Sequence, residues 1–183
     1  MNILIVNTSD IQGGAARAAY RLHRSLLNEG IDSQMLVQNK ASDDYTVLSS
    51  STKIAAKFAE IKLTLNSIPT KFYPHKSRTP FSPSWLPFSN IVKKINGIDP
   101  DIVHLHWICG GMLKIEDLAK IKKPIVWSLH DMWAFTGGCH YDEECGRYQE
   151  NCGYCKVLGS NKQNDLSSRI LKRKDRSFKR DDL

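Results

Sequence analysis

Three groups of residues in this sequence could do chemistry, and the first is a histidine-aspartate pair. His130 and Asp131 follow directly after the apolar run Ile125 to Leu129. A β-favouring run of this kind, placed after a proline, predicts a central parallel strand that is buried on both faces. Ligands of open α/β sheets bind beyond the carboxyl ends of the strands, so the pair is well placed for catalysis or substrate binding. In the alternative, the histidine is satisfied by its neighbouring carboxylate, and Asp131 holds the loop by accepting bonds from backbone amides.

The second group is a set of four cysteines in the glycine-containing loop 139–155: Cys139, Cys145, Cys152 and Cys155. Four thiols this close in sequence can bind one tetrahedral zinc ion, and the last two have the CxxC spacing of zinc ribbons. The loop has too few apolar residues to fold around its own core, so we expect a structural zinc ion. Free thiols or a thiol-disulfide pair are the alternatives. Cys109 stands apart and is expected to be a small buried residue.

The third group is a glycine turn between the first strand, Asn2 to Val6, and a helix that ends at Gly30. Gly13 and Gly14 allow close backbone approach, and the free amides of the first helical turn can bind an anion. Arg17 in that turn is a further substrate-binding candidate. The turn lacks the GxGxxG pattern of dinucleotide sites, and a tight turn needs glycine with or without a phosphate.

Two more histidines lie in the strong strand predicted for Asp101 to Trp107. His104 and His106 share one face of that strand because side chains alternate with a period of two. His106 lies near the carboxyl end and is the better site candidate. His104 is expected to be packed.

The remaining pattern alternates strands with helices, which predicts a doubly wound, mostly parallel, Rossmann-like sheet in an α/β domain. Further strands are expected at Ser33 to Gln38 and Ile125 to His130. The expected helices are Lys53 to Asn66, Phe88 to Asn96 (broken at Gly97) and Met112 to Lys120. Ser67 to Pro87 is rich in proline and aromatic residues and is expected to be a loop whose aromatics line a groove or pin the loop to the body.

Composition indicates one soluble globular domain covering residues 1–183. The chain has 41% hydrophobic and 25% charged residues and a formal charge of +7. No apolar run approaches the length of a membrane span, and MNILIV opens directly into a strand, so we expect a cytoplasmic protein. Much of the positive charge lies in residues 156–183, where a solvated helix face is the expected reading and nucleic-acid binding is not expected.

Three motifs in one order resemble a known family: GGAARAAYRLHRSL after the first strand, PDIVHLHW, and WSLHDMWAFTGGCHY followed by CGRYQENCGYC. Together they are similar to the amino-terminal half of bacterial family 4 (group 1) glycosyltransferases of exopolysaccharide, colanic-acid-like and O-antigen clusters. The resemblance runs through nearly the whole chain.

The resemblance implies one half of a GT-B fold, in an enzyme that transfers a sugar from a nucleotide-sugar donor with retention of configuration and without a catalytic metal. It implies that this domain holds the acceptor, a lipid-linked or oligosaccharide sugar, with peripheral contact to the inner membrane. Gly13 and Gly14 would lie near the donor diphosphate. His130 would reach the donor sugar beside the reaction centre.

The family's second domain, which binds the nucleotide, has no counterpart here, so we expect this chain to be inactive alone. Two other functions compete with this reading. One is a zinc-containing binding module without enzymatic activity. The other is a thiol oxidoreductase built on Cys152 and Cys155, which has the CxxC but lacks a thioredoxin-like context.

Overall fold

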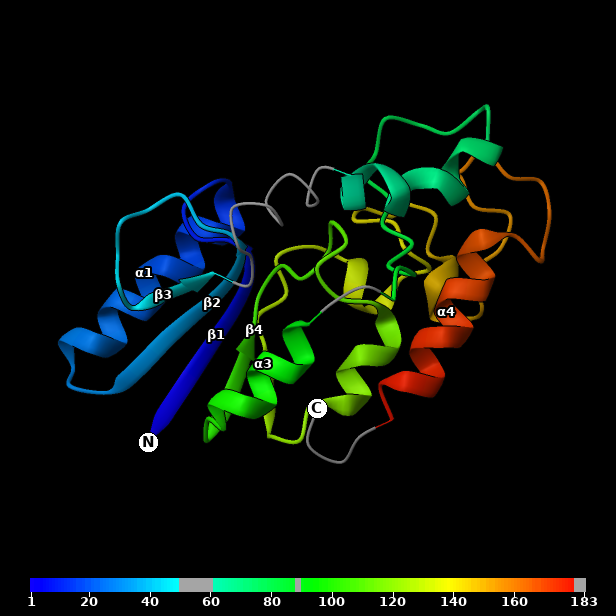
Figure 1. Cartoon of the computed structure of the whole chain (residues 1–183). Helices are drawn as coiled ribbons and strands as arrows, with labels where there is room; N and C mark the ends of the chain where they lie inside the picture. The colour runs from blue at the N-terminus through cyan, green and yellow to red at the C-terminus, as the bar shows by residue number, and fades with distance from the viewer. Residues whose placement is uncertain (50–60, 88–89, 180–183) are drawn as a thin grey trace.

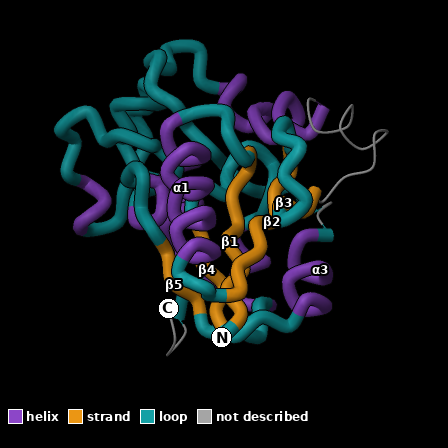
Figure 2. Tube along the Cα trace, turned by 90° about the vertical axis from the view of Figure 1, so that its left-hand side faces the viewer, coloured by secondary structure: helices purple, strands orange, loops and turns teal. Residues whose placement is uncertain are grey.

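The computed structural model describes residues 1–49, 61–87 and 90–179. Five parallel strands form one sheet in the order β3-β2-β1-β4-β5. The strands are β1 (Asn2–Ser9), β2 (Asp32–Asn39), β3 (Val47–Ser49), β4 (Ile102–Leu105) and β5 (Ile125–Trp127). The helices α1 (Gly14–Asn28) and α3 (Ile91–Ile98) cover opposite faces of the sheet (Figures 1 and 2). The predicted doubly wound, Rossmann-like α/β sheet is therefore confirmed.

The central position of β1 explains its unbroken apolar run. Leu4 and Val6 enter the core beneath α3, whereas Ile3 and Ile5 pack on the opposite face with Ala19 of α1. Alternate side chains of a strand point to opposite faces, so both must be apolar when helices cover both. Strand β1 is therefore held between two hydrophobic clusters, one on each face of the sheet.

Helix α1 has a glycine near each of its ends. Gly13 has a φ of 99°, which favours glycine, and it directly precedes the first helical residue. Gly30 has a φ of 74° and follows Glu29, the residue that caps the helix. The predicted end of this helix at Gly30 is confirmed.

Strand β5 lies at the edge of the described sheet, so the prediction of a central strand buried on both faces is wrong. Among the described residues it pairs only with β4. Ile125 is buried, but Val126 and Leu129 are 49% and 52% exposed. The apolar run marked a strand correctly, but it carried no information about the number of neighbouring strands.

Two predicted helices occur in altered form. Helix α3 runs through Gly97 to Ile98 and ends at Asp99, whose left-handed φ of 55° takes the place expected for the glycine; the predicted start, residues 88–89, lies outside the described residues. The predicted helix from Met112 is a shorter 3-10 helix, η2 (Ile115–Lys120), where the carboxylate of Asp117 accepts a bond from the amide of Lys114.

The segment between β3 and α3 follows the prediction in part. Residues 61–67 are helical, and the earlier part of the predicted helix, residues 53–60, lies outside the described residues. The predicted loop contains a short 3-10 helix, η1 (Ile68–Phe72), and an isolated β-bridge between Phe81 and Cys139. The short strand β3 was not predicted. Two further 3-10 helices, η3 (Trp133–Phe135) and η4 (Arg147–Gln149), lie in the segment that follows β5.

The last helix, α4 (Leu166–Ser177), is not simply the solvated basic face that its composition suggests. Lys174 is 2% exposed, donates to the carbonyls of Trp133 and Thr136, and lies 3.7 Å above the centre of the Trp133 ring. Burial lowers the pKa of this lysine to about 7. Arg173 forms two bonds with Glu116 of η2. Basic residues of α4 therefore attach the helix to the domain.

Within the part of the chain that the structure describes, no helix is both long enough and apolar enough to cross a bilayer.

Candidate active-site edge

The ends of β4 and β5 bring two predicted site residues into contact. Nδ1 of His106 lies 2.8 Å from Nε2 of His130, and the two rings stack with centroids 5.1 Å apart. One of these nitrogens must carry the hydrogen and the other must accept it. The sequence places His106 and His130 at the carboxyl ends of two predicted strands. Their contact with each other depends on the register between β4 and β5.

His104 continues the row of histidines. Its ring centroid is 4.6 Å from that of His106, and its Nε2 lies 2.9 Å from the hydroxyl of Ser128. The side chain is half-buried, in agreement with the prediction of a packed residue. Its cross-strand neighbour Val126 is exposed, so this part of the sheet face is open to solvent.

Burial makes His106 the most perturbed of these histidines. The side chain is 5% exposed, and burial, together with the charges that His104 and His130 would carry, lowers its pKa to about 4. Its Nε2 has no hydrogen-bond partner among the described residues. His106 is therefore neutral near pH 7. Its buried ring contacts the exposed ring of His130.

Asp131 holds the loop that carries His130. Its Oδ1 accepts from the amide of Trp133 at 2.8 Å, and its Oδ2 lies 2.6 Å from Nδ1 of His140 and 3.0 Å from Nε1 of Trp107. Burial alone would raise the pKa of this carboxyl, but the bonds from His140 and Trp133 outweigh it, so the pKa lies below its usual value. Because both oxygens are engaged, the geometry favours the turn-holding role over direct substrate contact.

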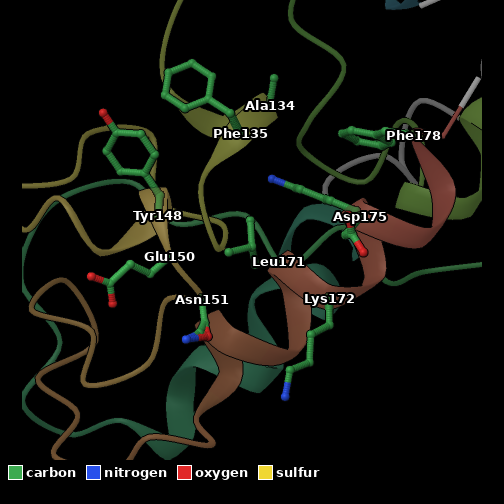
Figure 3. Close-up of a pocket in the computed structure, with 10 residues that line it drawn as sticks. Ala134, Phe135, Tyr148, Glu150, Asn151, Leu171, Lys172, Asp175 and Phe178 are labelled. Carbon is green, nitrogen blue, oxygen red and sulfur yellow. The ribbon is translucent and has the colours of Figure 1, made fainter.

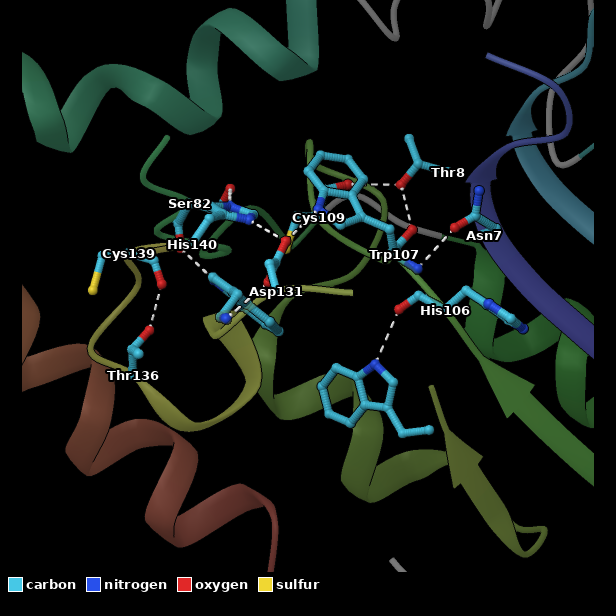
Figure 4. A network of polar contacts seen from close by, with 12 residues as sticks. Asn7, Thr8, Ser82, His106, Trp107, Cys109, Asp131, Thr136, Cys139 and His140 are labelled. Carbon is cyan, nitrogen blue, oxygen red and sulfur yellow. Dashed lines mark hydrogen bonds and ion pairs between the residues drawn. The ribbon is translucent and has the colours of Figure 1, made fainter. Parts of the chain in front are cut away.

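A network of polar contacts joins the carboxyl ends of the neighbouring strands β1 and β4 (Figure 4). The side-chain oxygen of Asn7 accepts from the amide of Trp107 at 2.7 Å, and the Thr8 hydroxyl donates to the Trp107 carbonyl at 2.9 Å. The indole of Trp127 donates to the carbonyl of His106 at 3.0 Å. These bonds fix the backbone that carries His106. Asn7 was missed as a supporting residue, although a polar residue directly after the apolar run Asn2 to Val6 was a visible signal. His140, which bonds to Asp131, was also missed, and it follows no strand that could have marked it.

The glycine turn lies at the same carboxyl edge of the sheet, after β1. Gly13 and Gly14 are exposed, and a Cβ added at either would meet no atom within 4 Å. No side chain caps α1, and Arg17 is exposed on its first turn. Strand β4 separates β1 from β5, and Gly13 and Gly14 are not among the residues that line the small hollow beside His130.

Asp10 is a buried carboxylate that the sequence did not single out. It accepts hydrogen bonds from the amides of Ile11, Ala41 and Ser42. Burial alone would raise its pKa, but the bonds from Ser42 and Ala41 outweigh it and lower the pKa. Asp10 thereby joins the loop after β1, which leads to the glycine turn, to the loop after β2.

The four clustered cysteines line one small hollow in the loop 139–155: Cys139, Cys145, Cys152 and Cys155. All four are free thiols, and no group of three or more Cys, His, Asp or Glu side chains in the described ranges forms a ready-made metal site. Burial raises the pKa of Cys152 and that of Cys155 to about 11 each. A reactive CxxC dithiol needs a lowered pKa, so this environment argues against a thiol oxidoreductase.

Cys109 is 1% exposed and packs in the main core, which confirms its prediction as a small buried residue.

Two larger hollows lie away from His106 and His130. One, of about 470 Å³, lies between η3, η4 and α4 and is bordered by Phe135, Tyr148 and Phe178 (Figure 3). Another, of about 680 Å³, is lined in part by Phe72 and Trp85 of the proline-rich loop. Thus some of that loop's aromatics line a groove, whereas Phe81 packs into the body. The hollow bordered by His106 and His130 measures only about 10 Å³.

Comparisons with known proteins place this geometry in a family. The sequence profile described as Glycosyltransferase Family 4 matches residues 12–176. A putative colanic acid biosynthesis glycosyl transferase, WcaC, of Escherichia coli (strain K12) is 25% identical over 177 residues. That alignment covers 87% of this chain and 40% of the relative, so the chain spans less than half the relative's length. No solved structure matches.

The family profile covers β2 to β5, α1 and nearly all of α4, including the turn at Gly13 and the histidine pair. The chain therefore belongs to glycosyltransferase family 4.

Proposed function

We propose that this chain forms the acceptor-side domain of a retaining, nucleotide-sugar-dependent glycosyltransferase of bacterial polysaccharide biosynthesis, including lipopolysaccharide. The observation that carries the proposal is the exposed ring of His130, held by His106 at the carboxyl edge of the sheet in a family 4 chain. The colanic acid assignment in the relative's name supports a polysaccharide product.

In the proposed reaction the bond between the anomeric carbon and the donor diphosphate breaks, and a bond from that carbon to an acceptor hydroxyl oxygen forms. The hydroxyl proton leaves with the diphosphate. His130 donates or accepts a hydrogen bond at a donor-sugar hydroxyl and so orients the anomeric carbon. His106 acts through His130 by fixing the ring of that histidine. Asp131 acts by fixing the turn that leads from His130 to Trp133. Positioning of this kind supplies much of the rate in group transfer.

The glycine turn is proposed to face the donor diphosphate. Gly13 and Gly14 leave open space above the first turn of α1, whose amides carry the positive end of the helix dipole. Arg17 would add a cation to the same end. The hydroxyl-bearing acceptor, a lipid-linked or oligosaccharide sugar, would approach the edge near His130.

We propose that the complete enzyme closes its cleft with a second, donor-binding domain and needs no catalytic metal. The hollow beside His106 and His130 is too small to enclose a sugar, as expected for one wall of a cleft between two domains. The chain alone would therefore not turn over a nucleotide sugar. A cytoplasmic location with peripheral contact to the inner membrane is also proposed, since exposed basic residues of α4 could meet anionic lipid. No nucleic-acid partner is proposed.

The test is His130→Ala in the domain joined to a compatible donor domain. Transfer of a labelled sugar should fall by about a hundredfold or more, because loss of the positioning bond spoils the reactive geometry. The melting temperature should stay nearly unchanged, since His130 is exposed. Both are measured on the same preparation.

His75→Ala is the matched control, because His75 is an exposed histidine that borders a different hollow. It should leave transfer unchanged. Parent-like activity of His130→Ala, or a loss that unfolding accounts for fully, would remove His130 from the site.

A further inference from the structure

The four cysteines of the loop 139–155 surround one cavity of about 10 Å³. This volume suits an atom-sized guest and excludes a substrate. Electrostatic interactions connect Cys152 with Cys139, Cys145 and Cys155, and Cys139 with Cys155. Cys152 is thus the common neighbour of the other three thiols.

The CxxC turn is held in an unusual backbone shape. Cys152, Gly153 and Tyr154 all have positive φ, at 53°, 87° and 47°. A Cβ added at Gly153 would come within 2.2 Å of the Gln163 carbonyl, so the turn packs closely on the next segment. A small apolar cluster packs beside it: Val157 and Leu158 are buried with Cys139 and Cys155, and Tyr73, Phe81 and Leu166 pack against them.

A buried lysine, Lys174, is linked to Cys139 through Thr136. Lys174 is 2% exposed, and among the described residues it forms no ion pair with a carboxylate. Its amino group bonds to the carbonyl of Thr136 at 3.0 Å, and Thr136 in turn donates to the carbonyl of Cys139 at 2.5 Å. Burial lowers the pKa of Lys174, and Cys109, Cys139, Cys152 and Asp131 act in the opposite direction.

We infer that Cys139, Cys145, Cys152 and Cys155 bind one structural zinc ion as a tetrathiolate, with Lys174 as its counter-charge. Binding releases the four thiol protons and leaves a centre of net charge −2, which the lysine half neutralises. The sulfurs must converge to about 2.3 Å from the ion, so binding draws the side chains inward over the cavity. The metal would add to the stabilisation that the small apolar cluster around Val157 and Leu158 provides.

The test uses residues 1–183, purified under reducing conditions. Metal analysis should give about one zinc per chain. Removal of the zinc and titration with Co²⁺ should then give the intense thiolate-to-cobalt charge-transfer absorption of a tetrahedral thiolate site. Because the titration uses the unmodified sequence, it does not depend on any variant folding.

Two variants sharpen the assignment. The double change Cys152→Ser and Cys155→Ser should abolish stoichiometric zinc, whereas Cys109→Ala, at the separate core cysteine, should retain it. Three results would overturn the inference: no zinc uptake by the reduced parent, full zinc retention by the double variant, or Co²⁺ spectra without thiolate ligation.

Discussion

The protonation of His106 should be visible in the stability of the whole domain. Its folded pKa is about 4, against 6.5 for an unperturbed histidine, because it is buried beside His104 and His130. Between these values the unfolded chain binds a proton that the folded chain does not. The free energy of unfolding should therefore fall as the pH drops from about 6.5 to about 4, by at most about 3 kcal/mol from this residue.

His106→Gln should flatten that pH dependence, and denaturant unfolding at several pH values measures it. His104 and His23 also have lowered pKa values and will contribute a remaining slope. The comparison is therefore between parent and variant across the same pH range. Parallel curves for the two proteins would show that His106 is not the titrating group.

At the residue scale, sequence reasoning could locate side chains but not their contacts. His130 and His106 were identified because each follows an apolar strand. The 2.8 Å bond between them depends on a strand register that no local pattern encodes. The burial of Lys174 was missed for a related reason. A lysine in a basic helix is expected to be solvated unless the packing of α4 on Trp133 is known.

At the scale of elements, Asp44 links α1 to the chain leading into β3. It accepts bonds from Tyr20 at 2.9 Å and Arg24 at 3.2 Å of α1, and from the amide of Thr46 at 2.9 Å. Burial alone would raise its pKa, but bonds from Thr46 and Tyr20 and the charge of Arg24 outweigh it and lower the pKa to about 2. The carboxylate therefore holds the helix against the sheet edge.

Asp44→Asn should change acid unfolding. Because the folded pKa is depressed, the stabilisation by Asp44 is present above about pH 4 and is lost as the pH falls toward 2. The variant should be less stable at neutral pH by about 1–2 kcal/mol and should lose less on acidification. Equal losses between pH 5 and pH 2 in both proteins would contradict this role.

The elements that sequence reasoning recovered best are those with local signals. β1 and α1 were predicted from an apolar run, a glycine turn and a terminal glycine. β5 was found but placed wrongly in the interior, since the number of strands beside it is a property of the assembled sheet. β3 is only three residues long and has no periodicity to detect.

At the scale of the whole molecule, Lys174 should couple the docking of α4 to the proposed zinc centre. Lys174→Met keeps most of the buried volume but removes the positive charge. Zinc affinity should fall about tenfold or more, because the net negative centre loses its buried counter-charge. Competition with a chelating dye measures the change.

Lys172→Met is the matched control, since Lys172 is exposed on the same helix. It should leave zinc affinity unchanged. If Lys174→Met binds zinc as tightly as the parent does, the lysine serves only to hold the Trp133 and Thr136 carbonyls.

The strand order also determines when the domain can form during synthesis. Ile3 of β1 pairs with Ser33 on one side and with Ile102 on the other. A ribosome adding roughly 5–20 residues per second delivers β4 roughly 3–13 seconds after β2. Until then β1 has one unpaired edge, and the face bearing Leu4 and Val6 lacks α3. The nascent chain can therefore pair β1 with β2 under α1 before the histidine edge can form, and α4 follows later still in the sequence.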